Sequence, residues 1–435
     1  MEAMNSEFEY WVPAILDSSK ARAFDREFTP ISALQHGAPI EFAVPGADLL
    51  YLDLAESYLL VTAKIQTAAN ADPAADAEVG PINLTLHSLF SNVDVDLGGK
   101  MISDPNGHYP YRAYLESLLT YDREAQESKL QCAGWYKDTA TKMKTFIALG
   151  ANATNLGLKS RAALFNSGAE VQLSGRIHSD IFHQPLAIPA NVPLKIKLTP
   201  SKDNFVIVTP APAGQNVQEN YKICITDARL YIHTIEVTHS LALAHEQMLL
   251  RKNAHFDIDR VTMKHITIPQ GQTSALHDNI FLGQLPKRVV VALVRDAAMA
   301  GGYQQNPFAF EHFDVNYLAL YVNGEMFPNR PYQPDYTHHK YIREYMSLCQ
   351  GMGVLNSNRS VSIPRSDFPD GYTIYVFDLT GEASSGPNKS ASKSGSIRIE
   401  LKFSAATPAT INILLYAEFD SFIEIDKYRS VIAPF

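Results

Sequence analysis

The sequence predicts an all-β protein with a few flanking helices, built as two tandem jelly-roll β-sandwiches. Three observations lead to this fold class. Short strands with apolar residues at alternate positions recur from Pro39 onward in the 435-residue chain, turns rich in Gly and Pro separate them, and several segments repeat in the same order in the two halves. Short strands separated by such turns favour a β-sandwich or a β-barrel over alternating strand–helix units. Each half offers about seven or eight strands, which fits a jelly roll.

The most informative stretch is 86–138. Apolar and acidic residues alternate through Val93–Leu97, Gly98-Gly99 supplies a turn with two positive φ angles, and Ile102 then falls opposite Val95. A loop and Pro110 follow, and Pro suits a first helical turn. The next apolar residues have helical spacing and predict an amphipathic helix: Tyr111, Tyr114, Leu115, Leu118 and Leu119.

The same hairpin recurs 225 residues later, where Asn323-Gly324 forms the turn and Phe327 falls opposite Leu320. Two further matches follow in order: the strand at 194–198 recurs at an offset of 203, and the segments at 223–237 recur at an offset of 188. An ordered set of matches with a shrinking offset indicates a tandem duplication in which the first copy has longer loops.

In chain order, residues 1–30 form an arm of mixed charge with Tyr10 and Trp11 as apolar anchors, and 31–238 form the first jelly roll with a helical insertion at about 108–138. Loops are expected at Thr67–Gly80, Ala148–Arg161 and Pro210–Gln218. The expected strands of this half, beside the hairpin, are Ile40–Val44, Tyr51–Leu54, Tyr58–Ile65, Glu170–Leu173, Ile177–Phe182, Leu194–Leu198, Phe205–Val208 and Lys222–Val237.

Residues 239–253 are expected to be a connecting helix, because His239–Lys252 has its apolar residues roughly aligned. The second jelly roll covers 254–435, with a short helix at Tyr341–Leu348 and an exposed loop at Gly381–Gly395. Its expected strands are Val261–Ile268, Arg288–Val294, Tyr317–Val322, Tyr372–Leu379, Ser396–Ser404 and Thr410–Ile425.

Composition excludes several classes of function. The net charge of -9 argues against a surface built mainly to neutralise phosphates, and no apolar run is long enough to cross a bilayer. The N-terminus lacks the apolar region of a signal peptide. Cys132, Cys224 and Cys349 are odd in number and far apart, which favours reduced thiols in an intracellular setting.

No nucleotide, zinc-protease or serine-hydrolase motif occurs, so the sequence assigns no catalytic, cofactor-binding or metal-binding residue. His338 and His339 lie in a loop near Tyr332, Tyr336 and Tyr341, the group that would be tested first for a metal or a ligand.

Three other features have structural interpretations. His178 and His183 bracket the predicted strand Ile177–Phe182, and their odd spacing would place them on opposite faces, which disfavours a shared metal. Asp94 and Asp96 favour a solvated face or a subunit contact over acid–base chemistry. Cys132 lies on a predicted helix near Trp135, which favours a packed thiol.

Long strings across most of the chain, from about Phe28 to Asp426, resemble capsid-like proteins of eukaryotic DNA viruses and integrated elements of the Polinton/Maverick and adintovirus kind. The strings are HSLFSNVDVDLGGKMI, YPYRAYLESLLTY, GWYKD, NIFLGQLPKR, NPFAFEHFDVNYLALYVNG, DGYTIYVFDLT and YAEFDSFIEID. The resemblance implies a double jelly-roll major capsid protein, or hexon. The chain is shorter than the major capsid proteins of better-known Polintons and virophages, which leaves a minor capsid role open.

The resemblance implies a homotrimer of pseudo-hexagonal outline that tiles an icosahedral shell, with helices after the hairpins touching neighbours and a minor capsid or penton protein as a further partner. It implies a virion location after assembly in the host nucleus or cytoplasm, with no cofactor, no membrane span and no sequence-specific nucleic-acid binding. The alternatives are a tandem jelly-roll enzyme or carbohydrate-binding protein, and a minor capsid or spike-base protein.

Overall fold

The strands of the first half pair into two antiparallel sheets. In the computed structural model, which describes residues 19–211, 220–380 and 393–434, these sheets have the strand orders β1-β10-β3-β7 and β2-β8-β5-β6. The bounds are β1 (Lys20–Phe28), β10 (Tyr221–Val237), β3 (Leu50–Thr67), β7 (Val171–Gly175), β2 (Ile40–Val44), β8 (Leu194–Pro200), β5 (Phe90–Leu97) and β6 (Lys100–Met101).

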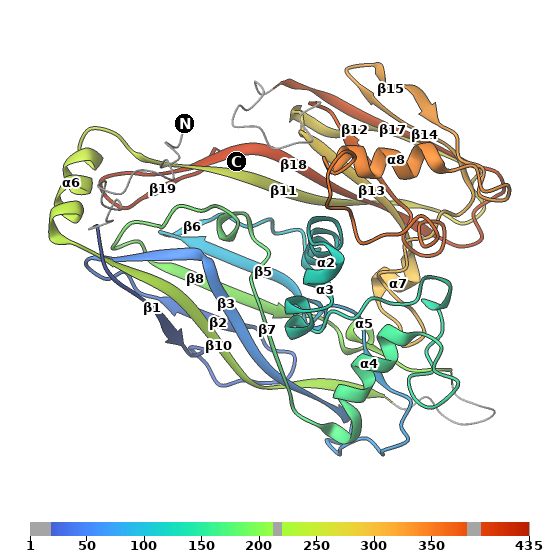
Figure 1. Ribbon diagram of the computed structural model, residues 1–435, viewed down its shortest axis with the longest axis horizontal. Coiled ribbons are helices and arrows are strands. Elements are labelled where there is room, and N and C mark those ends of the chain that lie inside the picture. Colours follow the sequence, from blue (N-terminus) through green and yellow to red (C-terminus); the bar gives the residue numbers. More distant parts are fainter. Residues whose placement is uncertain (1–18, 212–219, 381–392, 435) are drawn as a thin grey trace, which may run out of the picture.

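The second half repeats this arrangement. Its sheets have the orders β11-β18-β13-β16 and β12-β17-β14-β15, so each of these eight strands has a counterpart at the same place in the first half. The bounds are β11 (Ala254–Ile268), β18 (Ile411–Ile425), β13 (Arg288–Arg295), β16 (Ile374–Asp378), β12 (Ser274–Gln284), β17 (Ser394–Phe403), β14 (Val315–Val322) and β15 (Glu325–Tyr332). Each half is therefore a jelly roll, and the two lie side by side in Figure 1.

The pairing register confirms the duplication. Val95 of β5 lies opposite Ile196 of β8, and Leu320 of β14 lies opposite Ile399 of β17, at the offsets of 225 and 203 that the sequence predicts. The tight turns are also as predicted. Ile102 N donates to Val95 O at 2.9 Å, and Leu320 pairs with Phe327. Gly98-Gly99 and Asn323-Gly324 all have positive φ, as such two-residue turns require.

Within the described residues, three shorter strands lie outside these eight-strand frameworks, and helices fill the connections. β4 (Gly80–Pro81) pairs with β9 (Ile207–Val208), and β19 (Val431–Ile432) adds to β18. The helices are α1 (Thr85–Ser88), α2 (Tyr109–Thr120), α3 (Arg123–Gln126), η1 (Lys129–Ala133), η2 (Ala140–Lys142), α4 (Leu156–Leu164), η3 (Asn166–Gly168), η4 (Asp180–Phe182), α5 (Asp203–Val206), α6 (His239–Leu249), α7 (Asp296–Ala300) and α8 (Ile342–Gly351). The predicted helices near 111–119, 239–252 and 341–348 are confirmed as α2, α6 and α8.

Several local predictions are wrong. Part of the expected N-terminal arm is strand β1, which pairs with β10 because that long strand offers a free edge. The expected loop Ala148–Arg161 contains most of α4, and the expected strand Phe205–Val208 begins as α5. Strand β12 was not predicted, because the polar run His277–Asn279 interrupts its apolar alternation. Tyr10 and Trp11, and most of the loops at 210–218 and 381–395, lie outside the described residues.

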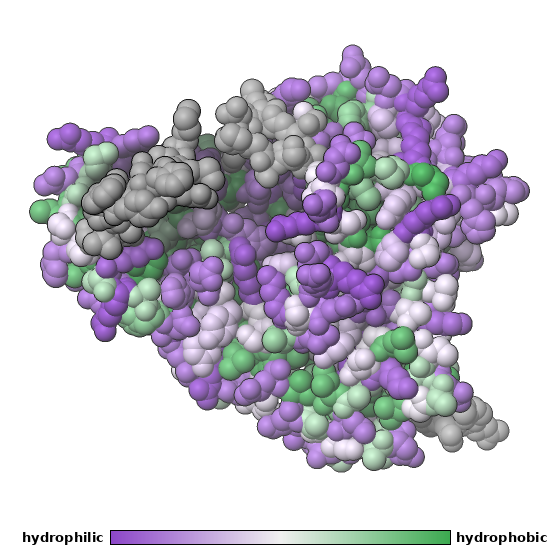
Figure 2. Space-filling model, in the orientation of Figure 1, coloured by the Kyte–Doolittle hydropathy of each residue, from purple (hydrophilic) through white to green (hydrophobic). Residues whose placement is uncertain are grey.

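The apolar core continues from the first jelly roll into the second. One cluster of buried side chains includes Leu54 and Val95 of the first half and Tyr372 and Val376 of the second, while a separate cluster fills the space between the two sheets of the second half. Figure 2 shows that hydrophilic residues cover much of the face in view, with hydrophobic patches in its lower half and at its upper right. The two jelly rolls thus share buried contacts, which concentrate around α2.

Candidate functional site: the joint between the two jelly rolls

Helix α2 is the centre of the joint. All its residues from Tyr109 to Leu119 are buried, and it lies between β5 and the second jelly roll (Figure 1). Tyr114 stacks on Phe308, which precedes β14, with ring centroids 4.1 Å apart and an interplanar angle of 2°. The expectation that this helix would flank the sandwich and touch neighbouring chains is therefore wrong, because both its apolar and its polar faces are covered within the chain.

The polar face of α2 carries a buried ion-pair network. Arg112 donates to Glu116 Oε1 at 2.8 Å and to Asp180 Oδ1 at 2.6 Å, and Asp180 is the first residue of η4. The second jelly roll joins the network through two bonds. Val261 N of β11 donates to Asp180 Oδ1 at 3.2 Å, and the Tyr416 hydroxyl of β18 donates to Glu116 Oε1 at 3.4 Å. The network therefore ties the two halves together through charged groups.

The electrostatics of this network follow from burial and pairing. Burial raises the pKa of Asp180 above its usual value, although Arg112 opposes this shift. Burial also acts to raise the pKa of Glu116, but the Arg112 charge and the hydrogen bond from His178 outweigh it and hold that pKa well below its usual range. Glu116 is therefore ionised at neutral pH.

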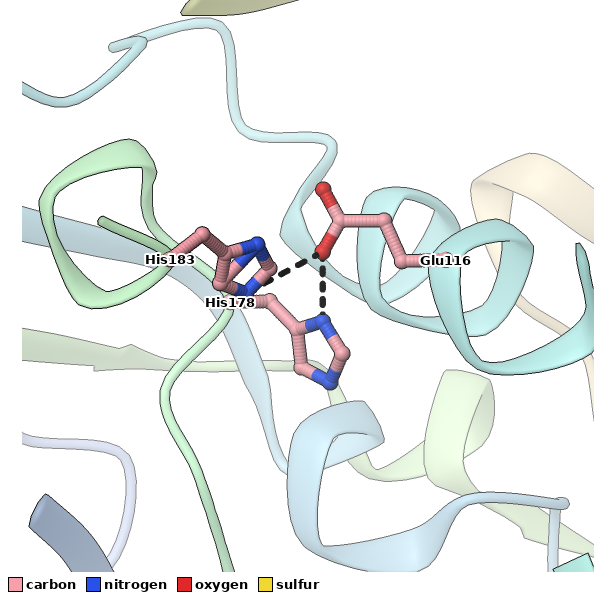
Figure 3. A group of neighbouring side chains, drawn as sticks. All are labelled: Glu116, His178 and His183. Carbon is pink, nitrogen blue, oxygen red and sulfur yellow. Dashed lines mark hydrogen bonds and ion pairs between the residues drawn. The ribbon is translucent and has the colours of Figure 1, made fainter. Parts of the chain in front are cut away.

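Two histidines complete the group around Glu116. His178 Nδ1 lies 2.6 Å from Glu116 Oε2, and His183 Nε2 lies 3.8 Å from the same oxygen, as Figure 3 shows. The prediction that these histidines lie on opposite faces of a strand is wrong. The segment turns through the 3₁₀ helix η4 instead, because Ile181 and Phe182 turn into the core, and this turn brings both imidazoles to one side. Burial lowers the pKa of His183 to about 4, so its ring is neutral at pH 7.

A second contact between the halves lies at the N-terminal end of α2. His108 Nε2 is 3.0 Å from His265 Nδ1 of β11, and Asp104 Oδ2 accepts a hydrogen bond from Met263 N at 2.9 Å. Burial, and then the neighbouring His265, lower the pKa of His108 to about 4. The ring of His108 is therefore neutral at pH 7 in this contact.

The far side of the joint is polar as well. Lys137 pairs with Asp367 at 2.7 Å and donates to Ser362 O at 2.9 Å, while the Tyr372 hydroxyl donates to Asp138 O at 2.8 Å. Buried Asp138 also pairs with Arg161 of α4 at 2.7 Å. Contacts of this kind surround α2, so the orientation of one jelly roll against the other is fixed by many directional bonds.

The candidates for a ligand site near β15 do not form one. The side chains of Tyr332, Tyr336 and Tyr341 are buried, and the Tyr336 hydroxyl lies 2.6 Å from that of Tyr375. His338 is exposed and pairs only locally with Asp335 at 2.7 Å, and His339 is exposed beside it. These tyrosines serve the core of the second jelly roll and offer no open aromatic platform.

The other candidates have structural explanations. Asp94 and Asp96 lie opposite Lys197 and Lys195 on the neighbouring strand β8, where opposite charges favour the pairing. Cys132 is exposed, so the prediction of a packed thiol is wrong: in η1 it is the neighbouring Ala133 that points inward. Cys224 is half-buried and Cys349 is buried, and the three thiols are unpaired.

Sequence reasoning missed the residues that hold the joint. Arg112 and Glu116 have the i, i+4 spacing of a helical ion pair, which was the available signal. Their burial was not readable from that spacing, because the same pair is common on exposed helices. Asp180 and Tyr416 lie far away in the sequence and give no local signal.

No family model matches the chain. An uncharacterized protein of Caenorhabditis elegans is 24% identical over 412 residues, which cover 92% of this chain and 94% of that protein. The alignment spans nearly the full length of both chains, and the name of this relative states no activity.

Solved structures are more informative about the fold. A chain of the Sputnik virophage superposes with a TM-score of 0.68 at 10% identity, over 99% of this chain and 91% of the other. The mavirus major capsid protein gives a TM-score of 0.56 at 12% identity, over 99% and 93% of the two chains. The Faustovirus major capsid protein gives 0.55 at 9% identity, over 95% and 92%.

Within the described residues, no helix is long and apolar enough to cross a membrane. The strand orders, the repeated register and the full-length superpositions agree with one another. The chain therefore has the double jelly-roll fold, which it shares with these viral major capsid proteins.

Proposed function

We propose that this chain is the major capsid protein of a eukaryotic double-stranded DNA virus or of an integrated virus-like element of the Polinton/Maverick or adintovirus kind. Three copies form a trimer of pseudo-hexagonal outline, and such trimers tile an icosahedral shell. The chain then acts as a structural protein with no catalytic residue, no cofactor and no metal needed for assembly.

The observation that carries the proposal is the equivalence of the two jelly rolls. Val95 and Leu320 occupy the same register position in the two halves, so each chain presents two lobes of like architecture. A ring of three such chains presents six lobes, and six-fold outlines pack a flat shell without gaps. The capsid proteins with the same fold support this interpretation.

The joint supports the proposal as well. A tile must keep its outline, so its two lobes must hold one orientation. The hydrogen bond from Val261 N to buried Asp180 and the stacking of Tyr114 on Phe308 both cross the joint and hold that orientation. A joint of this kind differs from a flexible linker between two independent binding modules.

The partners follow from the geometry of a shell. The chain contacts other copies of itself, and a penton or minor capsid protein fills the five-fold positions, where a six-lobed tile does not fit. The net charge of -9 argues against condensation of the genome by this chain and against sequence-specific binding of nucleic acid. The proposed location is the virion, after assembly in the nucleus or cytoplasm of the host.

Two alternative functions predict a different assembly of the chain. A minor capsid or spike-base protein would form its own oligomer but would enter shells only beside another major protein. A tandem jelly-roll enzyme or carbohydrate-binding protein would act as a monomer and need an open cleft. The burial of Tyr332, Tyr336 and Tyr341 weighs against the latter.

The test is the mass of the purified full-length chain by light scattering over a range of concentrations. The proposal predicts a species of three times the chain mass of 48.2 kDa, with larger assemblies as concentration rises. A mass that stays at one chain at every concentration would contradict it. Glycan binding by that monomer would then favour the carbohydrate-binding alternative.

A further inference from the structure

We propose that Glu116, His178 and His183 form a binding site for a divalent transition metal of the zinc class, set beside the joint between the two jelly rolls. This inference is independent of the proposed capsid function, because it rests on the side chains alone. Each of the three residues offers one ligand atom, and these atoms lie within 4.8 Å of one another. Figure 3 shows the two imidazoles directed at the same carboxylate.

The donor geometry is close to what zinc requires. Zinc binds imidazole nitrogen and carboxylate oxygen at about 2.0–2.2 Å, so a tetrahedral centre sets its donor atoms roughly 3.3–3.5 Å apart. The separation from Glu116 Oε2 is 2.6 Å for His178 Nδ1 and 3.8 Å for His183 Nε2. Shifts of less than about an ångström in side chains would place all three donors around one ion.

The two oxygens of the Glu116 carboxylate are divided between different partners. Oε1 accepts from Arg112 at 2.8 Å and from the Tyr416 hydroxyl, while Oε2 faces the two histidines. The guanidinium of Arg112 is in turn held by Asp180 at 2.6 Å. Arg112 therefore orients the carboxylate from the side opposite the proposed ion and shares its own charge with a second carboxylate.

The ligand His178 is held in place by its neighbours. The ring of His87 meets that of His178 edge-on, with centroids 4.6 Å apart, and Tyr109 binds both residues: its hydroxyl lies 2.8 Å from His87 Nδ1 and accepts from His178 N at 3.3 Å. Packing of this kind fixes the rotamer of a ligand before the ion arrives, which lowers the cost of binding.

The third ligand gives the ion a way in. The side chain of His183 is 35% exposed, whereas those of Glu116 and His178 are 8% exposed. An ion can therefore reach the site from solvent and bind His183 without unfolding the joint. Two imidazoles and one carboxylate leave a fourth position for water. This ligand set suits zinc, cobalt or nickel better than the oxygen-seeking magnesium and calcium.

The test uses the full-length chain without an affinity tag, stripped with a chelator and titrated with Co²⁺, whose tetrahedral complexes absorb in the visible. We expect one Co²⁺ per chain, displacement by Zn²⁺, and no comparable binding of Mg²⁺. We also expect Zn²⁺ to raise the Tm of the wild-type chain, because an ion that binds the folded state stabilises it.

The main variant is His183→Ala, and His338→Ala is its control, since His338 is also paired with a carboxylate but outside this group. We expect His183→Ala to weaken Co²⁺ binding at least tenfold and His338→Ala to leave it unchanged. Both should melt at the wild-type temperature in chelator. If His183→Ala does not fold, His183→Gln replaces it in the same comparison. Absence of stoichiometric binding by the wild-type chain, or equal binding by both variants, would overturn the proposal.

Discussion

The two jelly rolls differ most in one connection, the one that follows β6 in the first half and β15 in the second. In the first half it begins with α2, which is buried in the joint. In the second half it contains α8, which packs on β16 of its own jelly roll and leaves Ile342 and Met346 about two-fifths exposed. Strands at equivalent positions in the two halves are thus followed by helices in different environments, since α2 is buried and α8 is partly exposed.

The difference shows that the two halves share their strands but differ in the connection that forms the joint. The strands keep their order and register, because those determine the sandwich core. The connection between β6 and β7 contacts both halves, because it brings Glu116 to Tyr416 and Tyr114 to Phe308 of the second half. The two jelly rolls therefore share one strand framework, and the joint depends on the connection in which they differ.

The largest effect is expected for Arg112→Met. This change leaves Glu116 and Asp180 buried without their cation, which costs about 3–5 kcal/mol of unfolding free energy. Denaturant unfolding of the full chain measures it. Arg123→Met is the control, because the pair of Arg123 with Glu127 is exposed and its loss should leave stability unchanged. Equal stability of the two variants would show that the buried ion-pair network does not stabilise the fold.

The next largest effect is a difference in stability loss between truncations in α2 and in α8. Leu118→Ala in α2 should cost about 2–5 kcal/mol, because Leu118 is fully buried and its removal leaves a cavity. Met346→Ala in α8 should change stability by less than about 0.5 kcal/mol, because that side chain is 43% exposed. Similar losses in the two variants would mean that α8 is covered as α2 is.

A smaller loss is expected where α8 meets its own sheet. A Cβ on Gly351 would lie 2.5 Å from Val376 Cγ1 of β16, so Gly351→Ala must push the helix or the valine aside. Overpacking of this kind costs about 1–3 kcal/mol. Thermal melting measures the loss, and a melting temperature at or above that of the wild type would show that α8 is free to shift.

The smallest effect is a pH dependence at the His108–His265 contact. The pKa of His108 is lowered from 6.5 to about 4, so between these values the unfolded chain binds a proton that the folded chain does not. Stability contributed by this contact should therefore fall as the pH drops from about 6.5 toward 4. His108→Gln should flatten the Tm–pH profile in that window and exposed His338→Gln should not. Parallel profiles for all three chains would contradict this.

The sequence predicted the framework because strand patterning is local. Alternation at Val93–Leu97 and the turns at Gly98 and Asn323 determine hairpins, and the repeat offsets place those hairpins in equivalent positions. The joint was not predictable in the same way. Asp180 meets Arg112 of α2 and Val261 of the second half only after the chain has folded, and no spacing in the sequence indicates these contacts.

The failed predictions have a common cause. His178 and His183 were judged by a strand period, but the segment between them follows tertiary packing of Ile181 and Phe182 and turns as η4. Strand β12 was not predicted because its middle is polar, and its extended conformation depends on pairing with β17. In both cases contacts with distant segments outweighed the local pattern.

Electron microscopy of the oligomer in negative stain is the decisive measurement for the proposed trimer, since it shows whether two equivalent jelly rolls per chain form one six-lobed tile. We predict class averages of the trimeric species with six lobes in a pseudo-hexagonal outline, and closed or sheet-like arrays at higher concentration. Single particles with two lobes, or oligomers whose outline lacks this six-lobed symmetry, would contradict it.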